Sequence, residues 1–186
     1  MICVVSVILV LAVQPTSGDE GHKEVPVKPP AEPVLRKDQQ TSPRAVVIQG
    51  MHQSIQVNVD ALQDNIVGDA ANEPSIAIDP TNPDNIVIGW RQFDTIISDL
   101  RQAGYAYSHD GGATWTFPGV LEPGQFRSDP VLSANSAGDF FYYSLSTTTT
   151  AEMFISADQG VNWIGPISAP VSYTHLTLTT NRVAGW

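Results

Sequence analysis

One octapeptide pattern constrains this chain more than any other feature of its sequence. The residues Ser-x-Asp-x-Gly-x-x-Trp occur as Ser108-His109-Asp110-Gly111-Gly112-Ala113-Thr114-Trp115 and again as Ser156-Ala157-Asp158-Gln159-Gly160-Val161-Asn162-Trp163. The two copies lie 48 positions apart (156 minus 108). Self-similarity of this kind is the signature of a repeated structural unit. The chain is therefore expected to contain two similar units, each with one copy of the pattern.

The residue types in the pattern suit a tight hairpin turn better than catalysis. An Asp carboxylate can accept backbone N–H bonds across a turn, Gly permits a positive φ, and Trp covers the hairpin with a large apolar ring. A carboxylate that is occupied by backbone bonds is a poor proton carrier. The positions interpreted as structural are Ser108, Asp110, Gly112, Trp115, Ser156, Asp158, Gly160 and Trp163.

Short β-branched and aromatic runs surround both copies, and helix signals are almost absent. The strands expected in the first unit are Pro74–Ile78, Ile86–Trp90, Gly104–Ser108 and Trp115–Phe117. Those expected in the second unit are Pro130–Ala134, Phe140–Leu145, Met153–Ser156 and a strand from Trp163 onward. Two earlier strands are expected at Val46–Gln49 and at Ile55–Val59, where apolar and polar residues alternate. The predicted fold class is all-β, with each unit a four-stranded antiparallel meander.

Two such motifs at corresponding places in two four-stranded units resemble the sialidase-like family of Asp-box, or BNR, repeat proteins, whose fold is a β-propeller. The resemblance implies that residues 46–170 form about two blades of an incomplete propeller, because propellers of this family close with about six blades. In such a propeller the first strand of each blade lines the central channel. The Asp-box turns lie on one face, and the chemistry lies on the other.

On that other face the resemblance implies a set of candidate ligand-binding residues. Enzymes of the family clamp the carboxylate of an acidic sugar with arginines and use an Asp as the acid/base. Phe126-Arg127 followed by Pro130 is similar to the family's Phe/Tyr-Arg-Ile-Pro motif, with Ser128-Asp129 in place of the single Ile. The implied substrate-binding residues are Arg127, Arg91, Glu73 and Asp129, and the candidate acids are Asp94 and Asp99.

A structural alternative stays open for the same residues. Glu73 and Asp129 can cap the ends of the inner strands while Arg91 and Arg127 pair with these two carboxylates and bind nothing. His109 stands alone on a turn, and no second ligand is found at metal spacing, so neither a metal site nor a cofactor is predicted.

Charge and chain organisation narrow the classes of partner. Nineteen acidic against nine basic side chains give a formal charge of −10, which disfavours binding to nucleic acid and anionic lipid.

The apolar run from Ile2 to Val13 predicts a signal peptide over residues 1–18 and hence a secreted, periplasmic or extracellular protein without a stable membrane anchor. Residues 19–45 are rich in proline and are expected to be a linker. Residues 171–186 are expected to be a non-native or unstructured tail.

Two functions follow from the resemblance. The first is a glycoside hydrolase-like propeller that acts on sialic acid or another acidic sugar, for which this chain is an inactive fragment. The second is a noncatalytic propeller that binds an extracellular glycan or a cell-surface protein through the same face. A third possibility is an exported scaffold with no site for a small ligand, and the sequence leaves all three open.

Overall fold

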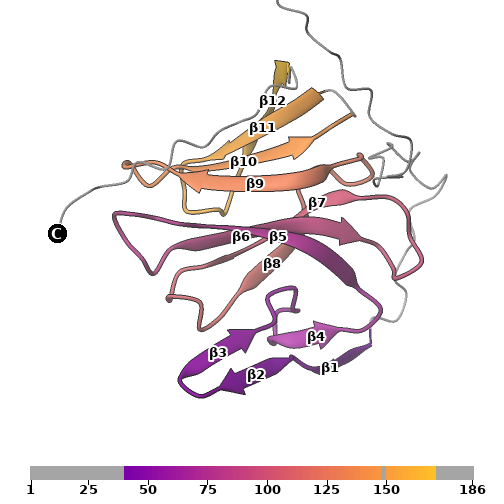
Figure 1. Cartoon of the computed structure of the whole chain (residues 1–186), viewed down its shortest axis with the longest axis vertical. Helices are drawn as coiled ribbons and strands as arrows, with labels where there is room; N and C mark the ends of the chain where they lie inside the picture. Colours follow the sequence, from indigo (N-terminus) through magenta and orange to yellow (C-terminus); the bar gives the residue numbers. More distant parts are fainter. Residues whose placement is uncertain (1–39, 148–149, 171–186) are drawn as a thin grey trace, which may run out of the picture.

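The computed structural model describes residues 40–147 and 150–170, and every regular element among them is a strand (Figure 1). The strands are β1 (Thr41–Pro43), β2 (Val46–Gln49), β3 (His52–Ile55), β4 (Asp64–Ile66), β5 (Ala70–Ile78), β6 (Ile86–Phe93), β7 (Gln102–Ser108), β8 (Thr116–Val120), β9 (Ser128–Ala134), β10 (Phe140–Leu145), β11 (Thr150–Ser156) and β12 (Ile164–Pro170). The predicted all-β class is confirmed. The expected signal peptide, most of the expected linker and the expected tail lie outside the described residues.

All pairings between these strands are antiparallel, and they form four sheets. The first sheet has the order β5-β6-β7-β8, and the second has the order β9-β10-β11-β12, so both are meanders in which neighbours along the chain are neighbours in the sheet. β1 pairs with β4, and β2 pairs with β3. The two four-stranded units expected from the sequence are thus both present.

The expectation of a strand over Ile55–Val59 is wrong. β3 ends at Ile55, and beyond it Val59 makes only an isolated bridge to Asn65. The alternating pattern there reflects packing, because Val57 and Val59 pack into the core of the first sheet while Gln56, which precedes them, bonds to the side chain of Asn65 at 2.6 Å. The strand β1 occupies the last residues of the expected linker, where it pairs with β4.

The strands of the two large sheets pair in corresponding registers. Ile86 pairs with Ile78 and with Ser108 in the first sheet, and Phe140 pairs with Ala134 and with Ser156 in the second. Because successive side chains in a strand point to opposite faces, this register gives each sheet two corresponding faces. We call the face that carries Ile86, or its counterpart Phe140, the front of the sheet, and we call the opposite face the back.

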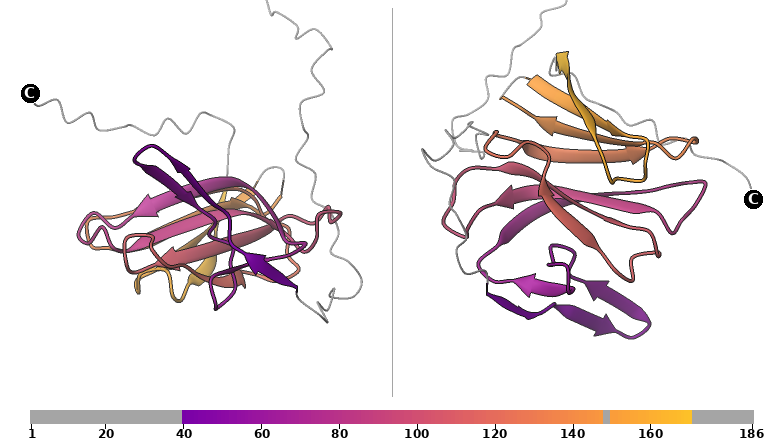
Figure 2. Two further views of the ribbon diagram at one scale, coloured as in Figure 1. Left: turned by 90° about the horizontal axis from the view of Figure 1, so that it is seen from below. Right: turned by 180° about the vertical axis from the view of Figure 1, so that it is seen from behind.

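Figures 1 and 2 show the second sheet stacked on the first, and the core residues show that the front of the second sheet packs on the back of the first. The shared core is apolar and contains Ala77, Val87, Ala103 and Tyr105 from the back of the first sheet, with Leu132, Phe140, Tyr142 and Phe154 from the front of the second. Gly89 provides the room for this contact, because a Cβ there would lie 2.4 Å from a ring carbon of Tyr142. The two sheets therefore stack in a fixed direction, front on back.

The segment that precedes the first sheet covers part of that sheet's front. Val57 and Val59 pack on Ile86, Trp90 and Trp115, and Val59 is only 1% exposed. In Figure 1 the strands β1 to β4 accordingly lie on the side of the first sheet that faces away from the second sheet. The molecule is thus a three-layer stack, with the small N-terminal strands as its first layer.

Two apolar surfaces of the stack remain open. On the back of the second sheet Val131, Tyr143 and Ile167 are 48%, 37% and 45% exposed. On the front of the first sheet the N-terminal segment leaves β5 uncovered, where Ile76 and Ile78 are 55% and 51% exposed. Apolar side chains are therefore exposed on the back of the second sheet and on part of the front of the first sheet.

Candidate functional site

The first Asp-box turn joins β7 to β8 and is closed by its own side chains. Ser108 Oγ accepts a bond from the Gly112 amide at 2.9 Å and donates one to Asp110 Oδ1 at 2.7 Å. Asp110 also accepts bonds from the backbone amide and the hydroxyl of Thr114, at 2.9 and 2.6 Å. The bonds from Thr114 and Ser108 lower the pKa of Asp110 to about 2. The carboxylate is thus held in its charged form by the turn itself.

The second Asp-box turn, between β11 and β12, repeats this arrangement. Ser156 Oγ bonds to the Gly160 amide and to Asp158 at 2.9 and 2.8 Å, and Asp158 accepts bonds from Asn162 at 2.9 and 2.7 Å. Burial opposes ionisation of Asp158, but the bonds from Asn162 and Ser156 outweigh it and leave the pKa below its usual value. In both turns the tryptophan indole donates to the glycine carbonyl, at 3.1 Å for Trp115 and 3.2 Å for Trp163.

The connections between strands gather at two ends of the stack. The β5–β6 and β7–β8 turns meet where the Gly111 amide donates to the carbonyl of Asp84 at 3.0 Å, and we call this the turn end. The β6–β7 and β8–β9 connections meet at the other end, where the Arg127 amide donates to the carbonyl of Arg101 at 2.8 Å. We call it the arginine end. It carries every residue for which the resemblance implies a role in ligand binding.

Arg91, on β6, joins the two sheets at the arginine end. Its guanidinium pairs with Glu73 at 2.6 Å and also with Asp129, and only 7% of its side chain is exposed. Glu73 and Asp129 precede Pro74 and Pro130 at corresponding points of β5 and β9, and both have left-handed backbone, with φ of 53° and 49°. The structure thus places three of the predicted ligand-binding residues in one network.

Arg127 forms a second network. It bonds through Nε to Glu122 at 3.0 Å and pairs through Nη1 with Glu152 at 2.5 Å, and its side chain is 4% exposed. The guanidinium also lies over the ring of Phe154, with 5.3 Å from Cζ to the ring centroid. The expected pairing of Arg127 with Glu73 or Asp129 is wrong, because both of those carboxylates pair with Arg91. Sequence reasoning missed the actual partners, Glu122 and Glu152. The available signal for Glu152 was its place as the only charged residue in an otherwise apolar or hydroxyl-bearing strand, β11.

The two candidate acids lie in the connection from β6 to β7. Asp94 Oδ1 accepts a bond from the side-chain amide of Gln102 at 2.9 Å, and Asp99 is exposed. Ile96 and Ile97 between them are also exposed, at 77% and 87%. This connection therefore presents both carboxyl groups and two isoleucines at the rim of the arginine end.

At the turn end, a histidine links the two Asp boxes. His109 Nε2 lies 3.2 Å from the carbonyl oxygen of Gln159, and its ring lies on Tyr107 with centroids 5.0 Å apart. Among residues 40–147 and 150–170, no three His, Cys, Asp or Glu side chains are arranged to hold a metal ion. The contacts of His109 are thus those of a packed surface residue.

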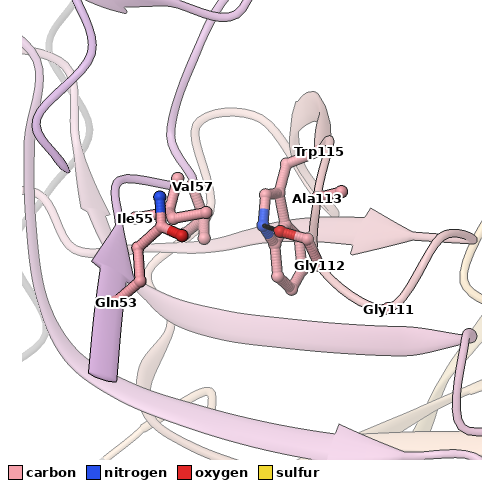
Figure 3. Close-up of a pocket in the computed structure, with 7 residues that line it drawn as sticks. All are labelled: Gln53, Ile55, Val57, Gly111, Gly112, Ala113 and Trp115. Atoms are coloured by element: carbon pink, nitrogen blue, oxygen red, sulfur yellow. Dashed lines mark hydrogen bonds between the residues drawn. The ribbon is translucent and has the colours of Figure 1, made fainter. Parts of the chain in front are cut away.

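An open pocket of about 390 Å³ lies between the hairpin β2–β3 and the first Asp box (Figure 3). It is lined by Gln53, Ile55, Val57, Gly111, Gly112, Ala113 and Trp115. The pocket lies at the turn end, away from the arginine end, where the N-terminal segment meets the first sheet. It contains no titratable lining residue that could serve as an acid or a base.

No protein-family model matches this sequence, and no curated protein matches it either. Within the part of the chain that the structure describes, no helix is long and apolar enough to cross a membrane.

Proposed function

We propose that residues 46–170 are two successive blades of a sialidase-like β-propeller that is exported and binds an extracellular glycan or protein without hydrolysing it. The proposed export derives from the apolar run at Ile2 to Val13. The proposed fold and the noncatalytic role draw on the structure, as set out below.

The direction of stacking supports a propeller. A propeller repeats one operation, in which the front of each sheet packs on the back of the sheet before it. The second sheet stands in this relation to the first, and the two Asp boxes repeat the same hydrogen bonds at corresponding positions. The back of the second sheet carries exposed apolar residues where the next repeat of this operation would place another front.

The noncatalytic part of the proposal rests on the burial and the carboxylate pairing of Arg91 and Arg127. Each guanidinium is at least 93% buried, and each already contacts two carboxylates. A ligand carboxylate could reach Arg91 or Arg127 only by displacing one of these partners. Two guanidiniums against Glu73, Asp129, Glu122 and Glu152 also leave the combined networks with a net charge of −2 (two minus four), which repels an acidic sugar.

The charge of this end favours neutral or basic ligands. The side chains of Glu73 and Asp129 are 51% and 44% exposed, so their negative charges lie at the protein surface. The exposed Ile96 and Ile97 add apolar contact area beside them. We therefore place the proposed binding surface at the arginine end, on the β6–β7 connection and the starts of β5 and β9.

A binding and hydrolysis experiment tests this function. The purified protein is titrated with sialyllactose and with lactose, is incubated with a fluorogenic sialoside, and is screened on an array of neutral and acidic glycans and basic peptides. The proposal predicts no release of fluorophore, no preference for sialyllactose, and a neutral or basic ligand whose binding is weakened by Asp99→Lys. Hydrolysis that is lost in Asp94→Asn or Asp99→Asn would establish the glycosidase alternative instead.

A further inference from the structure

The N-terminal segment packs on the front of the first sheet in the same way that the back of the first sheet packs on the front of the second. In the second sheet Trp163 packs against the back of the first sheet, with its ring 5.7 Å from that of Tyr105. The corresponding Trp115 of the first sheet has no such sheet to face. It packs instead on Val57 and Val59. The segment thus covers the indole that a preceding sheet would otherwise cover.

Specific hydrogen bonds hold the segment in this place. The side-chain amide of Gln63 bonds to both backbone groups of Trp115, accepting from its N–H at 2.9 Å and donating to its carbonyl at 2.7 Å. Asp60 Oδ1 shapes the loop by accepting bonds from the amides of Leu62 and Asp64, at 2.8 and 2.9 Å. An amide that satisfies a backbone N–H and C=O together replaces the pairing that another strand would give.

The segment fits less closely than a sheet does. Gly160 in the second Asp box lies so near the first sheet that a Cβ would stand 2.6 Å from Val87 Cγ2 and 3.1 Å from Tyr107 Cβ. At the corresponding Gly112 a Cβ would meet nothing closer than 3.5 Å, and the nearest atom belongs to its own turn. The open pocket in Figure 3 lies at this point. The segment therefore leaves room beside the first Asp box that the first sheet does not leave beside the second.

A second copy of this chain carries a surface of the required kind. The back of the second sheet presents Phe141 and Ile155 at the positions that Val87 and Tyr107 hold on the back of the first sheet, together with the exposed Val131 and Tyr143. The stacking within the chain provides the geometry for docking such a back onto a front. A contact of this kind between copies is heterologous, and it would join chains head to tail.

We propose that residues 56–66 form a cap on the front of the first sheet, which prevents that front from docking on the back of the second sheet of another copy. Capping of an exposed repeat face is the usual requirement for solubility in stacked-repeat proteins. The proposal applies to residues 40–170, in which the back of the second sheet is open, and it does not depend on the proposed ligand.

The test detaches the cap in the full chain and measures its mass. Val59→Asp places a carboxylate in a site that is 1% exposed, so the cap should leave the sheet. Val67→Asp is the matched control, because the same change at a side chain that is 47% exposed leaves the cap docked. Sedimentation velocity over a series of concentrations should give a monomer for the wild type and for Val67→Asp. Val59→Asp should give a mass at least about twofold higher that grows with concentration.

A second substitution distinguishes specific docking from unfolding. Val59→Asp combined with Tyr143→Lys, which places a charge on the back of the second sheet, should return to a monomer. The proposal is wrong if Val59→Asp keeps the near-ultraviolet circular dichroism of a folded protein and remains a monomer. It is also wrong if adding Tyr143→Lys does not change the association of Val59→Asp.

A milder variant covers the case in which Val59→Asp does not fold. Gln63→Ala removes the two bonds to Trp115 and keeps every apolar contact of the cap. It should associate more than the wild type and less than Val59→Asp, with faster amide exchange confined to residues 56–66. Faster exchange there in a protein that stays monomeric would overturn the proposal.

Discussion

The hydroxyl of Tyr142 on the second sheet donates a hydrogen bond to the carbonyl oxygen of Gly104 on the first sheet at 3.1 Å. The same hydroxyl lies 3.4 Å from the carbonyl oxygen of Trp90. Burial of the ring between the sheets raises the pKa of this hydroxyl, so it stays protonated and remains a donor. A single side chain thus ties the front of one sheet to two strands of the other.

Removal of this hydroxyl should weaken the stack without disrupting it. Tyr142→Phe keeps the ring and loses the donor, so we expect the free energy of unfolding to fall by about 1 kcal/mol. Tyr143→Phe, on the open back of the same strand, should change it by less than about 0.5 kcal/mol. Urea denaturation of the two variants gives both values, and equal effects would mean that the buried hydroxyl contributes nothing specific.

Loss of the Arg127 guanidinium should destabilise the fold rather than weaken an acidic ligand. Arg127→Ala leaves Glu122 and Glu152 without their shared cation, and breaking a buried pair in this way costs about 3–5 kcal/mol. The double variant Arg127→Met with Glu152→Gln removes charge from both sides and should recover most of that loss. Thermal melts measure the change in stability, and titration with sialyllactose measures any change in affinity for an acidic ligand. A variant of unchanged stability that loses affinity for sialyllactose would make Arg127 a ligand-binding residue.

The first Asp box should give the protein a defined sensitivity to acid. The folded-state pKa of Asp110, about 2, lies below the ordinary value of 3.8, so its contribution to stability is complete above pH 3.8 and is lost as the pH falls towards 2. Asp110→Asn should therefore have a lower melting temperature than the wild type at pH 6, and the gap should narrow between pH 4 and pH 2. A gap that is independent of pH would show that the ionised carboxylate is not what stabilises the turn.

The two Asp-box glycines offer a matched comparison. Gly112 and Gly160 have φ of 89° and 90°, so alanine meets the same backbone strain at both. A Cβ at Gly160 also collides with Val87 of the first sheet, whereas one at Gly112 does not collide with another element. We expect Gly160→Ala to be more destabilising than Gly112→Ala by about 1–3 kcal/mol. Equal losses in chemical denaturation would mean that the second box does not press on the first sheet.

Local features of the fold were predictable from sequence, because their cause lies within a few residues. The Asp-box bonds link residues two to four apart, and the strands beside them have clear β-branched and aromatic runs. The pattern misled at Ile55–Val59, where alternation arose from packing against a sheet that begins fifteen residues later, at Ala70 (70 minus 55). Periodicity alone cannot tell a paired strand from an extended segment that lies on a sheet.

The candidate site was predictable only in part. The sequence placed Arg91, Glu73 and Asp129 at one end, which the structure reproduces, and the pairing alternative for the arginines also came from the sequence. It did not reveal that Arg91 bridges the two sheets, since its partner Asp129 is 38 residues away. The partners of Arg127 were also not predicted, although Glu122 is only five residues away. Glu152 reaches it from β11, and its side chain is only 18% exposed.

We propose that the two sheets are consecutive repeats of one front-on-back stack, and a crystal structure of the full-length natural protein is the decisive test of this proposal. We predict a third four-stranded sheet whose front covers Val131, Tyr143 and Ile167, with an Asp-box glycine in contact with Phe141 as Gly160 is with Val87. A back of the second sheet that stays open in that structure, or that is covered by something other than a sheet, would contradict it.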